Sequence, residues 1–105
     1  MTATGGAAMT PALPAVEHVW VIEATYAADA AERRPQFRAE HLARIVELKA
    51  AGTLIEAGAF DDLSASLVMV RGDSEQAVLE VCRADVYCVN GVWTGLRARP
   101  FGRVA

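Results

Sequence analysis

The order of strand-forming and helix-forming runs limits the fold of this chain more than any other feature of its sequence. Residues 18–27 are rich in β-branched and aromatic residues, which favours a first strand. Residues 36–51 contain strong helix formers between a proline and a glycine, which predicts a helix. One side of this helix carries a largely apolar stripe at spacings of four, four and three, formed by Phe37, His41, Ile45 and Leu48.

The second half of the chain adds two strands, a helix and a last strand. Residues 54–60 and 64–70 are apolar, β-prone runs separated by a short polar link, which is typical of a hairpin. Ser74 is a candidate N-cap for a second helix that ends near Asp85. Apolar and polar or small side chains alternate enough in residues 92–99 to predict the last strand.

The order βαββαβ predicts an α+β fold of the ferredoxin-like kind, with a four-stranded antiparallel sheet and two helices on one face. A chain of 105 residues has room for one domain, which we place at residues 17–105, after a flexible N-terminal tail of residues 1–16. The second face of the sheet is left uncovered in this arrangement. A second copy of the chain could cover it, so we expect a homodimer.

Composition excludes several classes of partner. The net charge is −3 and the basic residues form no stripe, so we expect no nucleic acid. No apolar run approaches the roughly 20 residues of a membrane span and no secretory signal is visible, which predicts a cytoplasmic protein with no membrane partner. The spacing of Cys82 and Cys88 fits reduced, partly buried thiols better than a metal or redox pair. Glycine-rich phosphate loops are missing and the two histidines offer no three-ligand set, so we expect no cofactor and no metal; a single metal held by His41 and Asp85 is the alternative that stays open.

His41 and Asp85 are the residues most able to carry chemistry. His41 lies on the largely apolar side of its helix, where it is either a half-buried histidine bonded to a carbonyl or water, or a histidine that faces a cleft and moves a proton. Asp85 is either a solvated turn residue or the acceptor that orients this imidazole. Both helices lie on one face of the predicted sheet, so the two side chains could meet. Sequence spacing leaves these alternatives open.

Four further residues are candidates for binding a ligand. Arg38, three residues before His41, could receive an anionic group, although an exposed arginine is the commoner outcome. Gly58 either leaves room for a ligand or marks a bulge. The hydroxyls of Tyr26 and Tyr87 could line a pocket or only cap the core.

Several stretches of the chain together resemble the YCII-related family. The strongest element is Arg38-x-x-His41-Leu42, followed by Gly52 and then Ala57-Gly58. The similarity runs from about Val21 to the C-terminus and includes the stretches TYAADAAERR, RAEHLARI, GTLIEAGAF, ADVY and RPFGRV.

This resemblance implies a ferredoxin-like subunit that pairs into a dimeric α+β barrel. It also implies an active site built on a histidine and an aspartate, which match His41 and Asp85 here. The family commonly has Asp-Pro-Tyr where this chain has Asp85-Val86-Tyr87.

The leading hypothesis is a small enzyme that uses His41 and Asp85 for general acid-base chemistry on a small cyclic or phenolic compound. The reaction would be an elimination, an isomerisation or a dehydrochlorination, with Arg38 and Tyr26 positioning an oxygen of the substrate and Gly58 leaving space for it. One alternative is a non-catalytic dimer with a small-molecule-binding or regulatory role. Another is a cofactor-free monooxygenase of the dimeric α+β barrel type.

Overall fold

The computed structural model describes residues 13–105, and the predicted tail falls mostly on residues outside this range. The described chain runs through seven elements: β1 (Val16–Tyr26), α2 (Ala30–Ala50), β2 (Leu54–Ala59), β3 (Ala65–Val70), α3 (Glu75–Arg83), α4 (Val86–Val89) and β4 (Trp93–Val104). None of the helices in this part of the chain combines the length and hydropathy needed to span a membrane.

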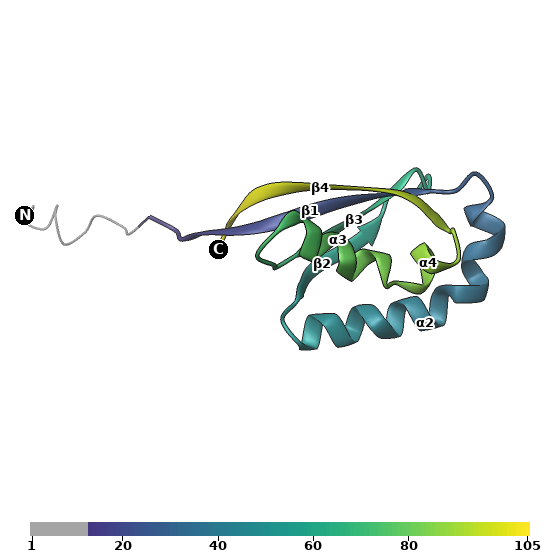
Figure 1. Ribbon diagram of the computed structural model, residues 1–105, viewed down its shortest axis with the longest axis horizontal. Helices are drawn as coiled ribbons and strands as arrows, with labels where there is room; N and C mark the ends of the chain where they lie inside the picture. The colour runs from purple at the N-terminus through teal and green to yellow at the C-terminus, as the bar shows by residue number, and fades with distance from the viewer. Residues whose placement is uncertain (1–12) are drawn as a thin grey trace, which may run out of the picture.

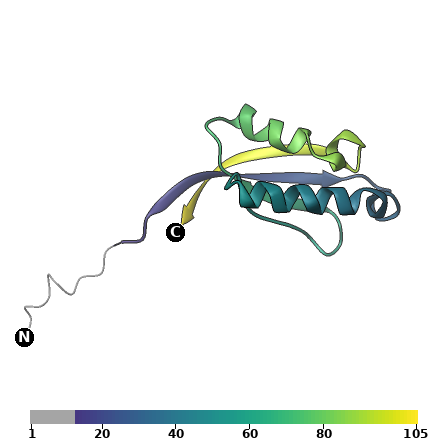
Figure 2. The ribbon, with the colours of Figure 1, turned by 90° about the horizontal axis from the view of Figure 1, so that it is seen from below.

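The four strands form one antiparallel sheet in the order β2-β3-β1-β4 (Figure 1). The helices cover a single face of this sheet, as the two views at right angles show (Figures 1 and 2). The structure therefore confirms the predicted α+β, ferredoxin-like fold. Within residues 13–105, the second face of the sheet carries no helix.

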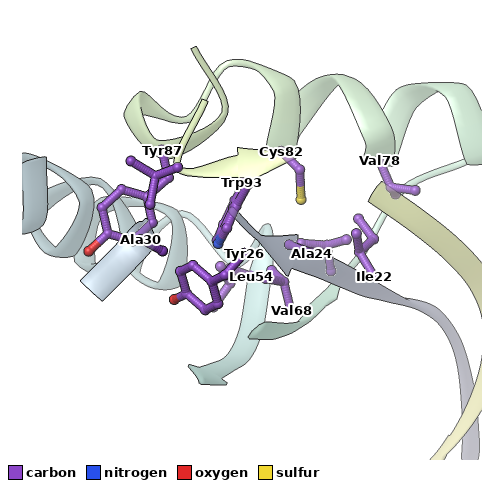
Figure 3. Close-up of a cluster of buried hydrophobic side chains, with 12 residues drawn as sticks. Ile22, Ala24, Tyr26, Ala30, Leu54, Val68, Val78, Cys82, Tyr87 and Trp93 are labelled. Atoms are coloured by element: carbon purple, nitrogen blue, oxygen red, sulfur yellow. The ribbon is translucent and has the colours of Figure 1, made fainter. Parts of the chain in front are cut away.

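Buried and more exposed side chains alternate along the central strands, and the buried ones form the core between the sheet and the helices. Ile22, Ala24 and Tyr26 of β1 are buried and point toward the helices, and Ile22 lies opposite Val68 of β3. These side chains meet others from α3, α4 and β4 in one cluster (Figure 3). The stripe predicted on the first helix packs against the same cluster through Phe37, Ile45 and Leu48.

The first helix begins earlier than the sequence predicted. α2 starts at Ala30, six residues before Gln36, and contains Pro35, where the sequence predicts the helix to start. A proline removes one backbone hydrogen bond and bends a helix, and Figure 1 shows the first turns of α2 at an angle to the rest. Tertiary contacts hold these turns: Ala30 is buried, and Arg33 donates hydrogen bonds to the carbonyl oxygens of Asn90 and Gly91.

The last strand is longer than predicted. β4 continues through Pro100 to Val104, whereas the prediction ended it at residue 99. A proline is tolerated on an edge strand, because its missing N–H can face solvent, and β4 is an edge strand. The extension pairs with the beginning of β1, from Val16 opposite Val104 onward.

The end of the second predicted helix is a junction between two helices. The Ser74 hydroxyl accepts a hydrogen bond from the backbone N–H of Ala77 at 3.1 Å, so the predicted N-cap is confirmed. α3 then ends at Arg83, and Asp85 is the N-cap of the separate helix α4. The Asp85 carboxylate accepts the backbone N–H of Tyr87 at 2.9 Å, which fixes the start of α4.

Replacing Val86 with proline should stabilise the protein by about 0.5–1 kcal/mol, because the folded backbone already suits a proline there. Val86 is the first residue of α4, a position where proline is favoured, and Asp85 has the extended conformation that precedes prolines (φ −68°, ψ 142°). Urea unfolding measures the change. Val89→Pro is the matched control and should destabilise, since the Val89 N–H bonds to the Asp85 carbonyl. A lower stability for Val86→Pro would contradict this view of the junction.

Candidate functional site

His41 lies on the inner side of α2 and is held by a carboxylate. Only 8% of the residue is exposed, and its Nδ1 atom lies 2.7 Å from Oδ2 of Asp85. An ionised carboxylate only accepts hydrogen bonds, so Nδ1 carries the hydrogen of this bond and Nε2 keeps a free lone pair in the neutral ring. No residue among 13–105 forms a hydrogen bond with Nε2.

Asp85 holds three groups at once. It is 1% exposed, and its carboxylate accepts bonds from His41, from the Tyr87 backbone N–H and, at 3.4 Å, from Nη1 of Arg44. Asp85 thus bonds its own turn, as one interpretation of the sequence expected, but it is buried and not solvated, and it also contacts the imidazole. The two interpretations are not exclusive, because the two oxygens of the carboxylate accept several donors.

Arg44 was not identified as a candidate from the sequence. Its guanidinium bonds the Asp85 carboxylate through Nη1 and the Val81 carbonyl oxygen through Nη2 at 2.8 Å. It therefore ties α2 to the end of α3 and supplies a positive charge beside a buried carboxylate. The available signal was its position three residues after His41, about one helical turn away.

Two aromatic rings fix the orientation of the imidazole. Tyr87 stacks on His41 with ring centroids 3.9 Å apart and planes inclined by 7°, and Trp93 meets His41 edge-on at 5.3 Å. Tyr87 is fully buried and does not line the cavity described below, so the structure places it as a support for His41. Burial raises the pKa of its phenol, which keeps this ring neutral.

A cavity of about 170 Å³ lies beside His41, between α2 and the sheet. Tyr26, Arg38 and Gly58, three of the residues proposed from the sequence to bind a ligand, line it together with His41. The bulge in β2 lies between Leu54 and Glu56, away from Gly58. A Cβ atom added at Gly58 would meet nothing within 4 Å, so a larger side chain there would occupy open space.

Three other lining residues were not singled out in the sequence. Arg34 precedes Arg38 by one turn of α2, and its guanidinium lies 5.7 Å from the centre of the Tyr26 ring. Ser66 of β3 shares a hydrogen bond of 2.8 Å with the Tyr26 hydroxyl. Trp93 contributes the ring that also contacts His41. Apolar side chains of α2, β2 and β3 complete the described wall: Leu42, Ile45, Ala57, Ala59 and Val68.

The two cysteines are free thiols and lie outside this cavity wall. Burial, followed by the nearby Asp85 charge, raises the pKa of Cys82 to about 12, and burial also raises the pKa of Cys88. The reactive species is the thiolate, so at pH 8 we expect a disulfide reagent to label folded protein far more slowly than protein in denaturant, with Cys82 the slower site. Rapid labelling of Cys82 in the folded state would contradict its buried position. Clusters of three or more histidine, cysteine or acidic side chains suited to a metal do not occur within residues 13–105.

The comparisons with known proteins agree with the fold. A search of the curated proteins finds no match. Among solved structures, the chain is similar to 5-chloro-2-hydroxyhydroquinone dehydrochlorinase (TftG) from Burkholderia phenoliruptrix, in complex with 2,5-dihydroxybenzoquinone. The TM-score is 0.67 and the identity 18%, over 79% of this chain and 92% of that chain, which is a likeness of fold. The family model of the YCII-related domain matches residues 19–102, as the resemblance in the sequence predicted. The chain therefore belongs to the family of YCII-related domains.

Proposed function

We propose that this protein is a small enzyme that moves protons on a one-ring phenolic or cyclic compound, with His41 as the acid and base. The observation that carries the proposal is the 2.7 Å contact between His41 and the buried Asp85, on a ring that lines a cavity and whose other nitrogen bonds no group of residues 13–105. A neutral imidazole held in one tautomer by a carboxylate is a general base at neutral pH. Asp85 orients the ring and stabilises the imidazolium that forms.

The chemistry follows from the single free nitrogen of His41. Nε2 takes a proton from a ring hydroxyl, whose electron pair moves into the ring, and returning the proton to a ring carbon gives the keto tautomer. That completes an isomerisation. If this carbon carries a halide, the halide leaves with its bonding electrons as Nε2, neutral again, takes the proton of a second hydroxyl. The net reaction is loss of hydrogen halide. Arg38 and Tyr26 position ring oxygens, and Gly58 leaves space for the ring.

The size of the cavity and the similar solved structure both support a one-ring compound. A cavity of about 150 Å³ is large enough to hold benzene, and the cavity beside His41 measures about 170 Å³. The similar structure is named for dehydrochlorination of a chlorinated hydroxyhydroquinone and holds a dihydroxybenzoquinone. A ring of this class is therefore the first compound to test.

The experiment is a turnover assay with chlorinated and unchlorinated hydroxyhydroquinones, in air and under nitrogen. Release of chloride and a change in the ring spectrum, at rates above buffer and independent of oxygen, are expected. A rate that required oxygen would favour the monooxygenase alternative. Compounds that bind without any turnover would favour the non-catalytic binding protein.

We also propose that the protein works as a homodimer that covers the second face of the sheet. Val21, Met69, Leu67 and Phe101 line a shallow apolar hollow there, and the last two are 40% and 46% exposed. Exposed apolar patches of this kind mark association sites, and a domain of this size gains stability by burying more surface.

Replacing Leu67 with glutamate should convert a dimer into monomers, because a buried, unpaired charge at the centre of the face would cost several kcal/mol. Light scattering behind a sizing column measures the mass. Leu13→Glu, at an exposed position before β1, is the matched control and should leave the mass unchanged. A native protein that elutes as a monomer at micromolar concentration would contradict the proposed dimer.

A further inference from the structure

The described side chains that line the cavity beside His41 include positive groups and no carboxylate. Arg34 and Arg38 line it, and neither forms an ion pair with any carboxylate of residues 13–105. Aspartate and glutamate are missing from the part of the lining that residues 13–105 form, and the buried Asp85 lies outside this wall. Two unpaired guanidinium groups in a wall without carboxylates create a positive potential inside the cavity.

Two buried donors in this wall are poorly satisfied. Nε of Arg34 and Nε1 of Trp93 are both enclosed and form no hydrogen bond of normal geometry within the described chain, although the guanidinium of Arg34 lies beside the Tyr87 hydroxyl. Figure 3 shows the indole nitrogen of Trp93 directed toward Tyr26, which lines the same cavity. Both groups only donate. Buried donors without a partner are rare because they are costly, and a ligand with acceptor oxygens would remove that cost.

The hydroxyl pair on the sheet side adds one more donor. The Tyr26 and Ser66 hydroxyls share one hydrogen bond of 2.8 Å. One of their two hydrogens is used in this bond, and the other is available to a ligand. Apart from the Nε2 acceptor of His41, the polar side chains of the wall thus offer donors on several sides, whereas Leu42, Ile45 and Val68 present apolar surface.

We infer that the cavity selects a planar, one-ring anion whose charged oxygens lie against Arg34 and Arg38 and whose ring oxygen accepts the Trp93 N–H. This inference names the substrate class of the proposed enzyme and rests on that proposal for the position of the ring beside His41. Phenolates, hydroxyquinone anions and ring carboxylates share the required chemistry.

The test is a calorimetric titration of the native protein with 4-hydroxybenzoate and with 4-hydroxybenzamide. The two probes have nearly the same shape and differ in charge. The anion should bind about tenfold more tightly or better, as expected when a charged group is held by guanidinium groups in a partly enclosed site. Equal affinities would overturn the inference.

Three variants locate the effect. Arg34→Gln should remove most of the preference for the anion, whereas Arg83→Gln, an equal change of charge at an exposed site outside the cavity, should keep it. Trp93→Phe keeps an aromatic ring against His41 and removes only the indole N–H. The affinity for both probes should therefore fall at least about threefold. Circular dichroism checks that each variant is folded.

The outcomes separate this inference from the proposed function. A preference that survives in Arg34→Gln overturns the anion site, and unchanged binding in Trp93→Phe overturns the indole contact. Neither result depends on turnover. Conversely, selective binding of the anion with no turnover of any hydroxyhydroquinone would contradict the enzyme and leave the anion site standing.

Discussion

Replacing His41 with glutamine should lower turnover of a hydroxyhydroquinone substrate by at least about a hundredfold while the protein stays folded. A positioned general acid or base contributes about 10²- to 10⁴-fold to a rate, and glutamine cannot take or give a proton at neutral pH. Glutamine still offers an amide N–H to the Asp85 carboxylate, which limits the damage to the buried site. The initial rate of chloride release measures the effect.

Arg83→Gln serves as the matched control for the turnover assay, since Arg83 is exposed at the end of α3 and lies outside the cavity wall. Its rate should equal the native rate. A His41→Gln protein that keeps the native rate would show that His41 has no part in the reaction. A variant that unfolds would be recognised by circular dichroism, and the slightly different His41→Asn would then be measured.

Replacing Asp85 with alanine should destabilise the protein by about 3 kcal/mol or more. The change removes the carboxylate that bonds the His41 ring and the Arg44 guanidinium, and it also removes the N-cap of α4. His41, Arg44 and the Tyr87 N–H all bond this carboxylate, which is 1% exposed. A domain has only about 5–15 kcal/mol of stability in total. Urea unfolding measures the loss.

Asp85→Asn separates the structural role of the residue from its chemical role. Its amide oxygen can still accept from His41 and from the Tyr87 N–H, so the loss of stability should be smaller than for alanine. Turnover should nevertheless fall strongly, because a neutral amide no longer stabilises the imidazolium. Asp61→Ala, at an exposed position in the β2–β3 link, is the control and should change stability by no more than about 0.5 kcal/mol. Equal stability of Asp85→Ala and Asp61→Ala would contradict the contacts assigned to Asp85.

The sequence was sufficient to predict the fold and to find the two central residues. The order of periodic runs predicted the sheet and its helices, and the stripe on α2 placed His41 on the inner side, as the structure shows. The contact between His41 and Asp85 depends on how α2 and α4 approach each other in space. That approach is set by packing and by tertiary bonds such as those of Arg44, which leave no mark on periodicity.

Arg34 illustrates why the rest of the site could not be predicted. Because a proline favours the start of a helix, the sequence predicts a helix only from residue 36 and leaves Arg34 outside it, whereas in the structure Arg34 lies one turn before Arg38 on α2. The helix extends over the proline because Arg33 bonds two carbonyl oxygens more than fifty residues away. Such long-range bonds override the local preference of proline, and only the folded structure reveals them.

Hydrogen exchange at a ring carbon tests the central claim most directly, because it reports proton transfer without requiring a leaving group. Unchlorinated hydroxyhydroquinone is incubated with the protein in D₂O, and incorporation of deuterium into the ring is followed by NMR. We predict incorporation above the buffer rate with the native protein and with Arg83→Gln, and a return to the buffer rate with His41→Gln. Binding of the compound by the native protein with no exchange above buffer would contradict acid-base catalysis by His41.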